Sequence, residues 1–159
     1  MIQRIQSIYL LLVIAISGLL FIPPAAPISF VKSATSNEFD IVLNLFSLKT
    51  RCVSIDQPVY YMSLIIFNSL IILFALFALL KFKQRPLQVR LCYFNMLLVL
   101  LLFGCMYMFT DMMKHKTANP SVIYLLGFYL PPLQIILLFL AAKAINKDEK
   151  LVRSADRLR

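Results

Sequence analysis

One uncharged run of 22 residues, VYYMSLIIFNSLIILFALFALL at positions 59–80, decides the fold of this 159-residue chain. The hydrocarbon core of a bilayer is about 30 Å thick, so about 20 helical residues are needed to cross it. Lipid offers no partner for backbone N–H and C=O groups, so a crossing segment must satisfy these groups internally as an α-helix. The run therefore predicts a membrane-spanning helix.

Three further segments are about as long and as apolar, at residues 5–25, 88–109 and 121–142. The whole chain is 61% hydrophobic and only 14% charged, with a mean hydropathy of +0.84, which excludes an ordinary soluble globular domain. We predict an all-α fold: one integral membrane domain built as a four-helix bundle, followed by a polar tail at residues 143–159.

Lysine and arginine are unevenly divided between the two sides of these four spans. One side has eleven: Arg4, Lys81, Lys83, Arg85, Arg90, Lys143, Lys147, Lys150, Arg153, Arg157 and Arg159. The other side has five: Lys32, Lys49, Arg51, Lys114 and Lys116. Because positively charged loops stay on the cytoplasmic side, we expect both termini to be cytoplasmic.

The connection at residues 26–58 is expected on the outer side. Apolar and polar residues partly alternate between Phe39 and Phe46, which favours strands and predicts a small outer β-hairpin over the mouth of the bundle. A short interfacial helix after Thr35-Ser36-Asn37 is the alternative. Cys52 lies in the same connection, where it could stay free or pair between chains.

Uncharged polar side chains inside the spans are the best internal clues to a site: Ser17, Asn68, Asn95 and Gln134. Each needs a hydrogen-bond partner in hydrocarbon, and we interpret the group as structural contacts between helices. Their depths predict that Asn95 meets Gln134, and that Asn68 meets Ser17 or a free carbonyl of the fourth span.

The fourth span contains Pro131 and Pro132, which remove two backbone donors and free the carbonyls of Gly127 and Phe128. We expect a kink there, with Gly127, Pro131 and Gln134 on a face that points into the bundle. A path lined by Asn68, Pro131 and Gln134 is the alternative function, that of a small transporter or channel component.

Chemistry-bearing residues are few, with one histidine and three glycines in the chain. Phosphate loops and multi-histidine metal sites therefore lack their residues, and we expect no catalytic, cofactor or metal site and no nucleic acid partner. His115 follows Asp111 by four residues, the spacing of a solvated contact on one helical turn. Cys92 and Cys105 are too far apart on one helix to bridge each other.

The tail carries an apolar stripe at Leu151, Val152, Ala155 and Leu158 among basic residues. It either rests on the anionic inner leaflet or docks onto a membrane or cytosolic protein. In the docking hypothesis the cytoplasmic contact face comprises Arg85, Gln88, Arg90, Lys150, Arg153, Arg157 and Arg159. The sequence also allows a homo-oligomer.

Three stretches carry a family resemblance: MIQRIQSIYL at 1–10, RPLQVRL at 85–91 and AINKDEKLVRSADRLR at 144–159. Together they resemble an uncharacterised bacterial family of four-span membrane proteins, domain of unknown function 4293. The resemblance implies the same topology and a place in the bacterial inner membrane, and it brings no catalytic residues. We expect a non-catalytic accessory or structural subunit.

Overall fold

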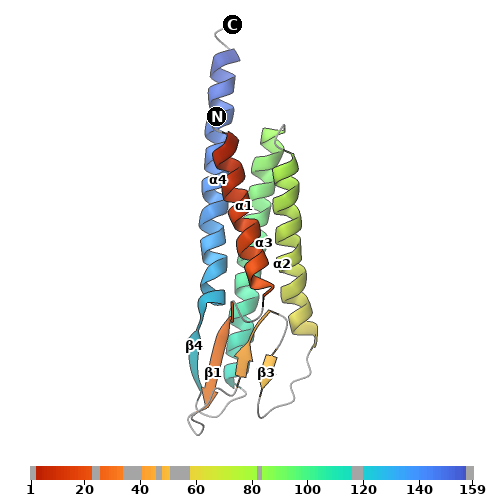
Figure 1. The fold of residues 1–159 in the computed structure, drawn as a ribbon, viewed down its shortest axis with the longest axis vertical. Coiled ribbons are helices and arrows are strands. Elements are labelled where there is room, and N and C mark those ends of the chain that lie inside the picture. Colours follow the sequence, from red (N-terminus) through yellow and green to blue (C-terminus); the bar gives the residue numbers. More distant parts are fainter. Residues whose placement is uncertain are drawn as a thin grey trace.

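The computed structural model describes residues 3–22, 26–33, 41–45, 48–50, 58–81, 84–115 and 120–156. These residues form four helices and four strands. In chain order they are α1 (Gln3–Leu20), β1 (Ser29–Ser33), β2 (Ile41–Leu43), β3 (Leu48–Thr50), α2 (Pro58–Leu80), α3 (Arg85–His115), β4 (Pro120–Tyr124) and α4 (Leu126–Asp156). The helices run side by side in an elongated bundle with the strands at one end, which we call the sheet end (Figure 1). Both termini lie at the opposite end, the terminal end (Figure 1).

Each helix packs against two others, α1 and α3 against both α2 and α4, so the bundle closes on itself. On α3 the buried residues recur every three or four positions, at Gln88, Cys92, Asn95, Leu98, Val99, Leu102, Met106, Thr110 and Met113. This is the spacing of one helical face, which here points into the bundle. Large apolar side chains such as Leu73, Leu100 and Ile136 are more than half exposed on the outer surface.

Three of the described helices contain segments long and apolar enough to cross a membrane: Met62–Leu80, Arg85–His115 and Leu126–Leu151. The apolar part of α1, Gln6–Leu20, is shorter. The predicted first span, 5–25, is therefore too long at its carboxyl end, because α1 ends at Leu20. Two prolines follow at Pro23 and Pro24, and the residue before a proline is kept out of the helical region.

The cap is larger than the predicted hairpin. β2 lies within the alternating stretch at 39–46 and pairs with β3, which lies beyond that stretch at Leu48–Thr50. The described strands form a four-stranded antiparallel sheet in the order β3-β2-β1-β4. The expectation that Ser121 to Tyr124 begin the fourth span is wrong, because these residues pair with β1 in β4. Val122, Ile123 and Tyr124 are residue types that favour strands. The alternative helix after Thr35 lies outside the described residues.

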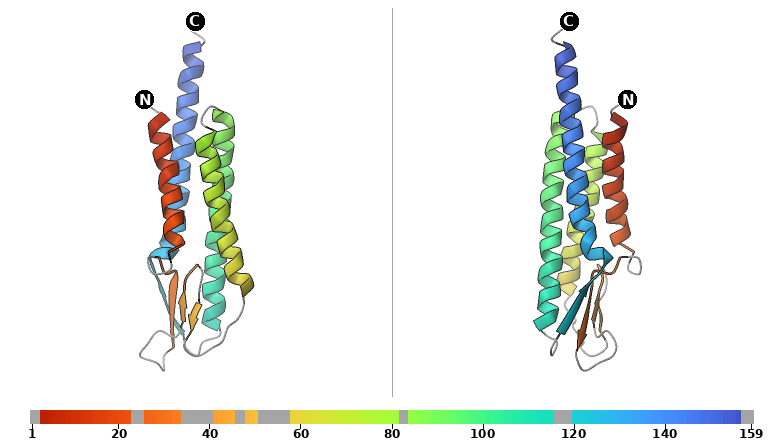
Figure 2. Two further views of the ribbon diagram at one scale, coloured as in Figure 1. Left: turned by 45° about the vertical axis from the view of Figure 1, so that its right-hand side comes forward. Right: turned by 90° about the vertical axis from the view of Figure 1, so that its left-hand side faces the viewer.

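The β1–β4 pair joins the sheet to the bundle. Since β1 follows α1 and β4 precedes α4, two antiparallel helices continue into two antiparallel strands (Figure 2). The end of α3 packs beside the sheet, where the hydroxyl oxygens of Ser29 and Thr110 lie 3.2 Å apart. The sheet is thus held by two neighbouring helices and by the end of a third.

Backbone contacts extend the β1–β4 pairing into the first turn of α4. The Leu125 N–H donates to the Ile28 carbonyl, and the Gly127 N–H donates to the Pro27 carbonyl, each at 3.0 Å. A Cβ on Gly127 would lie 2.6 Å from the Ala26 carbonyl oxygen and 2.7 Å from that of Pro27. Only glycine allows the two backbone segments to lie this close together without a shift. Gly127 therefore determines the distance between the start of α4 and the segment that follows α1.

We predict that Gly127→Ala lowers the free energy of unfolding in detergent by about 1–3 kcal/mol, the usual cost of forcing extra atoms into a packed site. Gly104→Ala is the matched control, because a Cβ built there would have no atom of another described element within 4 Å. The control should be neutral or stabilising by up to about 1 kcal/mol, since alanine favours helix. Equal unfolding midpoints for the two variants would contradict the close approach.

Candidate functional site

Ser17 on α1 is the centre of a buried polar layer inside the bundle. The Gln134 side-chain amide on α4 donates to the Ser17 hydroxyl at 2.9 Å, and the Asn68 amide on α2 donates to the Ser17 backbone carbonyl at 3.0 Å. All three side chains are completely buried. Asn68 thus binds Ser17, one of the two partners expected for it. Ser17 thereby connects three helices.

The expected contact between Asn95 and Gln134 is wrong. The Asn95 amide donates to the Ile71 backbone carbonyl at 3.3 Å and joins α3 to α2. The Gln134 amide donates to Ser17 instead. Depth along the helices was the basis of the expectation, and depth does not say which of two neighbouring helices a side chain faces. The two amides therefore serve different helix pairs.

Three buried amide oxygens of the helices accept no hydrogen bond within the described part of the chain: Asn68 Oδ1 and Gln134 Oε1 of this layer, and Asn95 Oδ1. A buried amide oxygen normally has a donor. The layer therefore retains capacity to accept hydrogen bonds from a water molecule or from a donor group of a ligand.

The two prolines of α4 lie within its second turn, after a helix start at Leu126. Gly127, Pro131, Gln134 and Leu138 are all buried, as the sequence predicted for that face. The same stripe continues through Ala141, Ala142 and Ile145 to Asp148.

A second polar group lies at the terminal end of the bundle. Arg85 at the start of α3 pairs with Asp148 on α4, with Nη2 3.2 Å from Oδ2 and Nη1 donating to the Asp148 carbonyl at 3.4 Å. Gln6 of α1 donates to the Ala144 carbonyl of α4 at 3.2 Å. These contacts fasten α1 and α3 to α4 beyond its apolar part. Sequence reasoning missed the ion pair, although Asp148 continues the buried stripe of α4 at helical spacing.

These contacts change the predicted cytoplasmic contact face. Gln88 is only 3% exposed, so it belongs to the interior of the bundle and not to an exposed face. Arg85 is half-buried and already paired with Asp148. Arg90 and Lys150 are exposed. The side chain of Arg153, and the whole of Arg157 and Arg159, lie outside what the structure describes.

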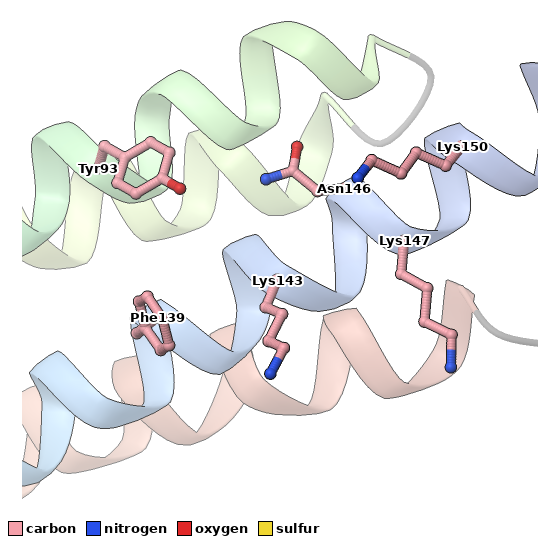
Figure 3. Close-up of a pocket in the computed structure, with 6 residues that line it drawn as sticks. All are labelled: Tyr93, Phe139, Lys143, Asn146, Lys147 and Lys150. Carbon is pink, nitrogen blue, oxygen red and sulfur yellow. The ribbon is translucent and has the colours of Figure 1, made fainter.

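Near the same end a groove of about 440 Å³ opens on the outer surface between α3 and α4. It is lined by Tyr93 of α3 and by Phe139, Lys143, Asn146, Lys147 and Lys150 of α4 (Figure 3). Asn146 and Lys150 lie on the flank of α4 that faces α3, whereas Lys143 and Lys147 extend along the other flank (Figure 3). The groove joins two aromatic rings to three ammonium groups.

The remaining candidates carry little chemistry. His115 Nε2 lies 3.4 Å from Asp111 Oδ2, as the i, i+4 spacing predicted, and both side chains are well exposed. Cys92 and Cys105 are free, while Cys52 lies outside the described residues. Within the described ranges, no group of three or more His, Cys, Asp or Glu side chains could hold a metal ion.

Three described helices are long and apolar enough to cross a membrane, the outer surface of the bundle is apolar and the polar contacts between helices are buried, as in a helical membrane protein. The chain belongs to the family described as domain of unknown function (DUF4293), whose family model matches residues 2–158. A search of curated proteins finds no match, and a search of solved structures finds none either.

We predict that Ser17→Ala and Gln134→Leu couple in a double-mutant cycle of thermal unfolding, because each removes the same hydrogen bond. The expected interaction energy is about 0.6–2 kcal/mol, typical of polar contacts between membrane helices. Asn95→Leu with Gln134→Leu is the matched comparison and should be additive, since the two amides share no partner. Coupling in the second cycle without coupling in the first would refute the observed pairing.

Proposed function

We propose that this chain is a non-catalytic, multi-pass protein of the bacterial inner membrane, an accessory or structural subunit that contacts a partner protein at its terminal end. The observation that carries this proposal is the length of α4. This helix continues to Asp156 and extends past the other helices at the terminal end (Figure 1). A helix that protrudes from its own bundle offers a surface to another molecule.

Membrane insertion is supported by the dimensions of the helices. From Leu126 to Ala142, α4 has no charged residue and covers about 26 Å at about 1.5 Å per residue, close to the hydrocarbon thickness. The 18 residues of α1 cover about 27 Å by the same rise, which makes α1 the fourth span of the proposal. Exposed tyrosines occur towards both ends, with Tyr93 at one and Tyr107, Tyr124 and Tyr129 at the other, as in aromatic belts.

The uneven distribution of basic residues supports the orientation. The terminal end includes Arg90, Lys143, Lys147 and Lys150, each exposed, and the excess of lysine and arginine over the other side is eleven to five along the whole sequence. Positive charge is retained in the cytoplasm, so the proposal places both termini inside and the sheet outside.

The protruding part of α4 has the composition of a docking helix. Leu151 is 48% exposed although it is large and apolar, and Lys150 beside it is exposed too. Asp148 is the last buried residue of the stripe, so the segment that follows it has no cover from the bundle among the described residues. An amphipathic helix of this kind fits an apolar groove with an acidic rim on a partner protein.

A small transporter or channel component is the second candidate, favoured by the three buried amide oxygens without a donor among the described residues. Pro131 lies on the same buried face as Gln134. The Ser17 and Gln134 double-mutant cycle separates the two candidates. If the layer is structural, the substitutions lower the free energy of unfolding. If it lines a transport path, they reduce transport activity without a comparable change in the free energy of unfolding.

The orientation predicts the activity of alkaline phosphatase fusions in a bacterial host. A fusion after Arg159 should be inactive because the enzyme stays in the cytoplasm, and a fusion after Lys49 should be active because α1 has carried it outside. Enzyme activity normalised to fusion protein is the measurement. The reverse pattern would overturn the orientation, and activity in neither fusion would overturn the outer location of the sheet.

The docking hypothesis predicts that deleting residues 151–159 leaves the chain in the membrane with an unchanged unfolding midpoint but removes a partner from the complex isolated in mild detergent. Leu151→Asp should have the same effect, because it places a charge on the apolar stripe.

Ser154→Asp is the matched control for Leu151→Asp, since it adds the same charge at another exposed position on the protruding segment. It should retain the partner. If the deletion variant and Leu151→Asp both retain the same co-purifying proteins as the wild-type chain, the tail does not bind the partner and the docking hypothesis is wrong.

A further inference from the structure

The groove between α3 and α4 lies beside the start of the α4 extension, and its lining combines two kinds of surface. Tyr93 and Phe139 are about half exposed and apolar, and three lysines and Asn146 continue the lining towards the carboxyl end of α4. None of the lining residues is acidic. Asp148, a buried carboxylate two residues before Lys150, lies on the inner side of α4 and pairs with Arg85.

We infer that this groove binds the headgroup of an anionic phospholipid. Lysine ammonium groups and the Asn146 amide donate to phosphate oxygens, and basic pockets between membrane helices are the usual sites for such headgroups. The inference rests on the membrane insertion in the proposed function, and it adds a specific lipid site to it.

The depth of the groove matches the boundary between hydrocarbon and headgroups. Lys143 is the first charged residue after the uncharged stretch of α4, and on α3 the apolar stretch begins directly after Arg90, three residues before Tyr93. A lipid phosphate occupies this level in a bilayer. Lys143, Asn146 and Lys150 follow at i, i+3 and i+7, so their backbone positions share one face of α4. The long Lys143 side chain starts from that face and extends along the other flank (Figure 3).

The apolar part of the lining favours a lipid over a soluble phosphate. Phe139 lies one helical turn before Lys143, towards the sheet end, and it is 50% exposed. Leu140 and Ile136, also exposed, continue the outer apolar surface of α4. An acyl chain attached to a phosphate at Lys143 and Lys150 would lie along this surface. A soluble anion would leave it uncovered.

The test uses the full-length chain purified in mild detergent, with lipid binding measured by native mass spectrometry. The probes are dioleoyl-phosphatidylglycerol and dioleoyl-phosphatidylcholine, which have the same acyl chains and differ in net charge. The wild-type chain should bind phosphatidylglycerol more tightly. Lys143→Gln with Lys150→Gln should weaken phosphatidylglycerol binding by roughly 30-fold, at about fivefold per lysine, and leave phosphatidylcholine binding unchanged.

Lys81→Gln with Lys114→Gln is the matched control, because it removes two exposed positive charges that lie outside the groove. It should change phosphatidylglycerol binding by less than about twofold, since headgroup attraction falls off within a Debye length. An equal loss in both double variants would show attraction to net charge alone and overturn the site. Equal binding of the two lipids to the wild-type chain would overturn it as well.

Two further arms separate the sources of failure. Competition by millimolar sn-glycerol 3-phosphate would show a site for soluble anions and overturn the lipid site, whereas no competition supports it. Extraction of the chain from membranes by alkaline carbonate would overturn the proposed membrane insertion itself. A chain that resists carbonate but binds both lipids equally loses only the lipid site.

Discussion

Ser17 shows the constraint on which the bundle depends, that polar groups removed from water must find partners within the protein. Its hydroxyl accepts from Gln134 of α4 and its carbonyl accepts from Asn68 of α2. Apolar side chains alone specify helix contacts weakly in lipid, because a hydrocarbon tail is as good a neighbour as leucine. Two directed hydrogen bonds to one residue therefore fix the rotation and depth of α1 relative to two other helices.

The same helices are held at two further levels. At the sheet end, β1 and β4 continue α1 and α4, and Gly127 allows their backbones to approach. At the terminal end, Gln6 and Arg85 attach α1 and α3 to α4. α4 takes part at every level, which explains how its last turns can leave the bundle as a straight extension without loosening it.

Much of this architecture could be predicted from the sequence, because length and hydropathy dictate which segments can be helices in lipid. The long helices, the inward face of α4 at Gln134 and the binding of Asn68 to Ser17 followed from spacing and depth. β4 could not be predicted, because its partner Ser29–Ser33 lies about 90 residues away in sequence and a short apolar run directly before a long apolar segment cannot be told from the start of a helix by periodicity. The Asn95 partner was missed because a backbone carbonyl such as that of Ile71 leaves no signal in the sequence.

The two ends of the molecule differ in a way that bears on function. At the sheet end β1 and β4 pack beside the end of α3, and the buried hydroxyl groups of Ser29 and Thr110 belong to that contact. At the terminal end, exposed lysines, the groove and the uncovered part of α4 lie together. Lys150 lies in the groove and also directly before Leu151 on the extension. A lipid phosphate held by Lys150 would neutralise charge at the base of the extension, so the proposed lipid site and the proposed partner surface would be coupled through one side chain.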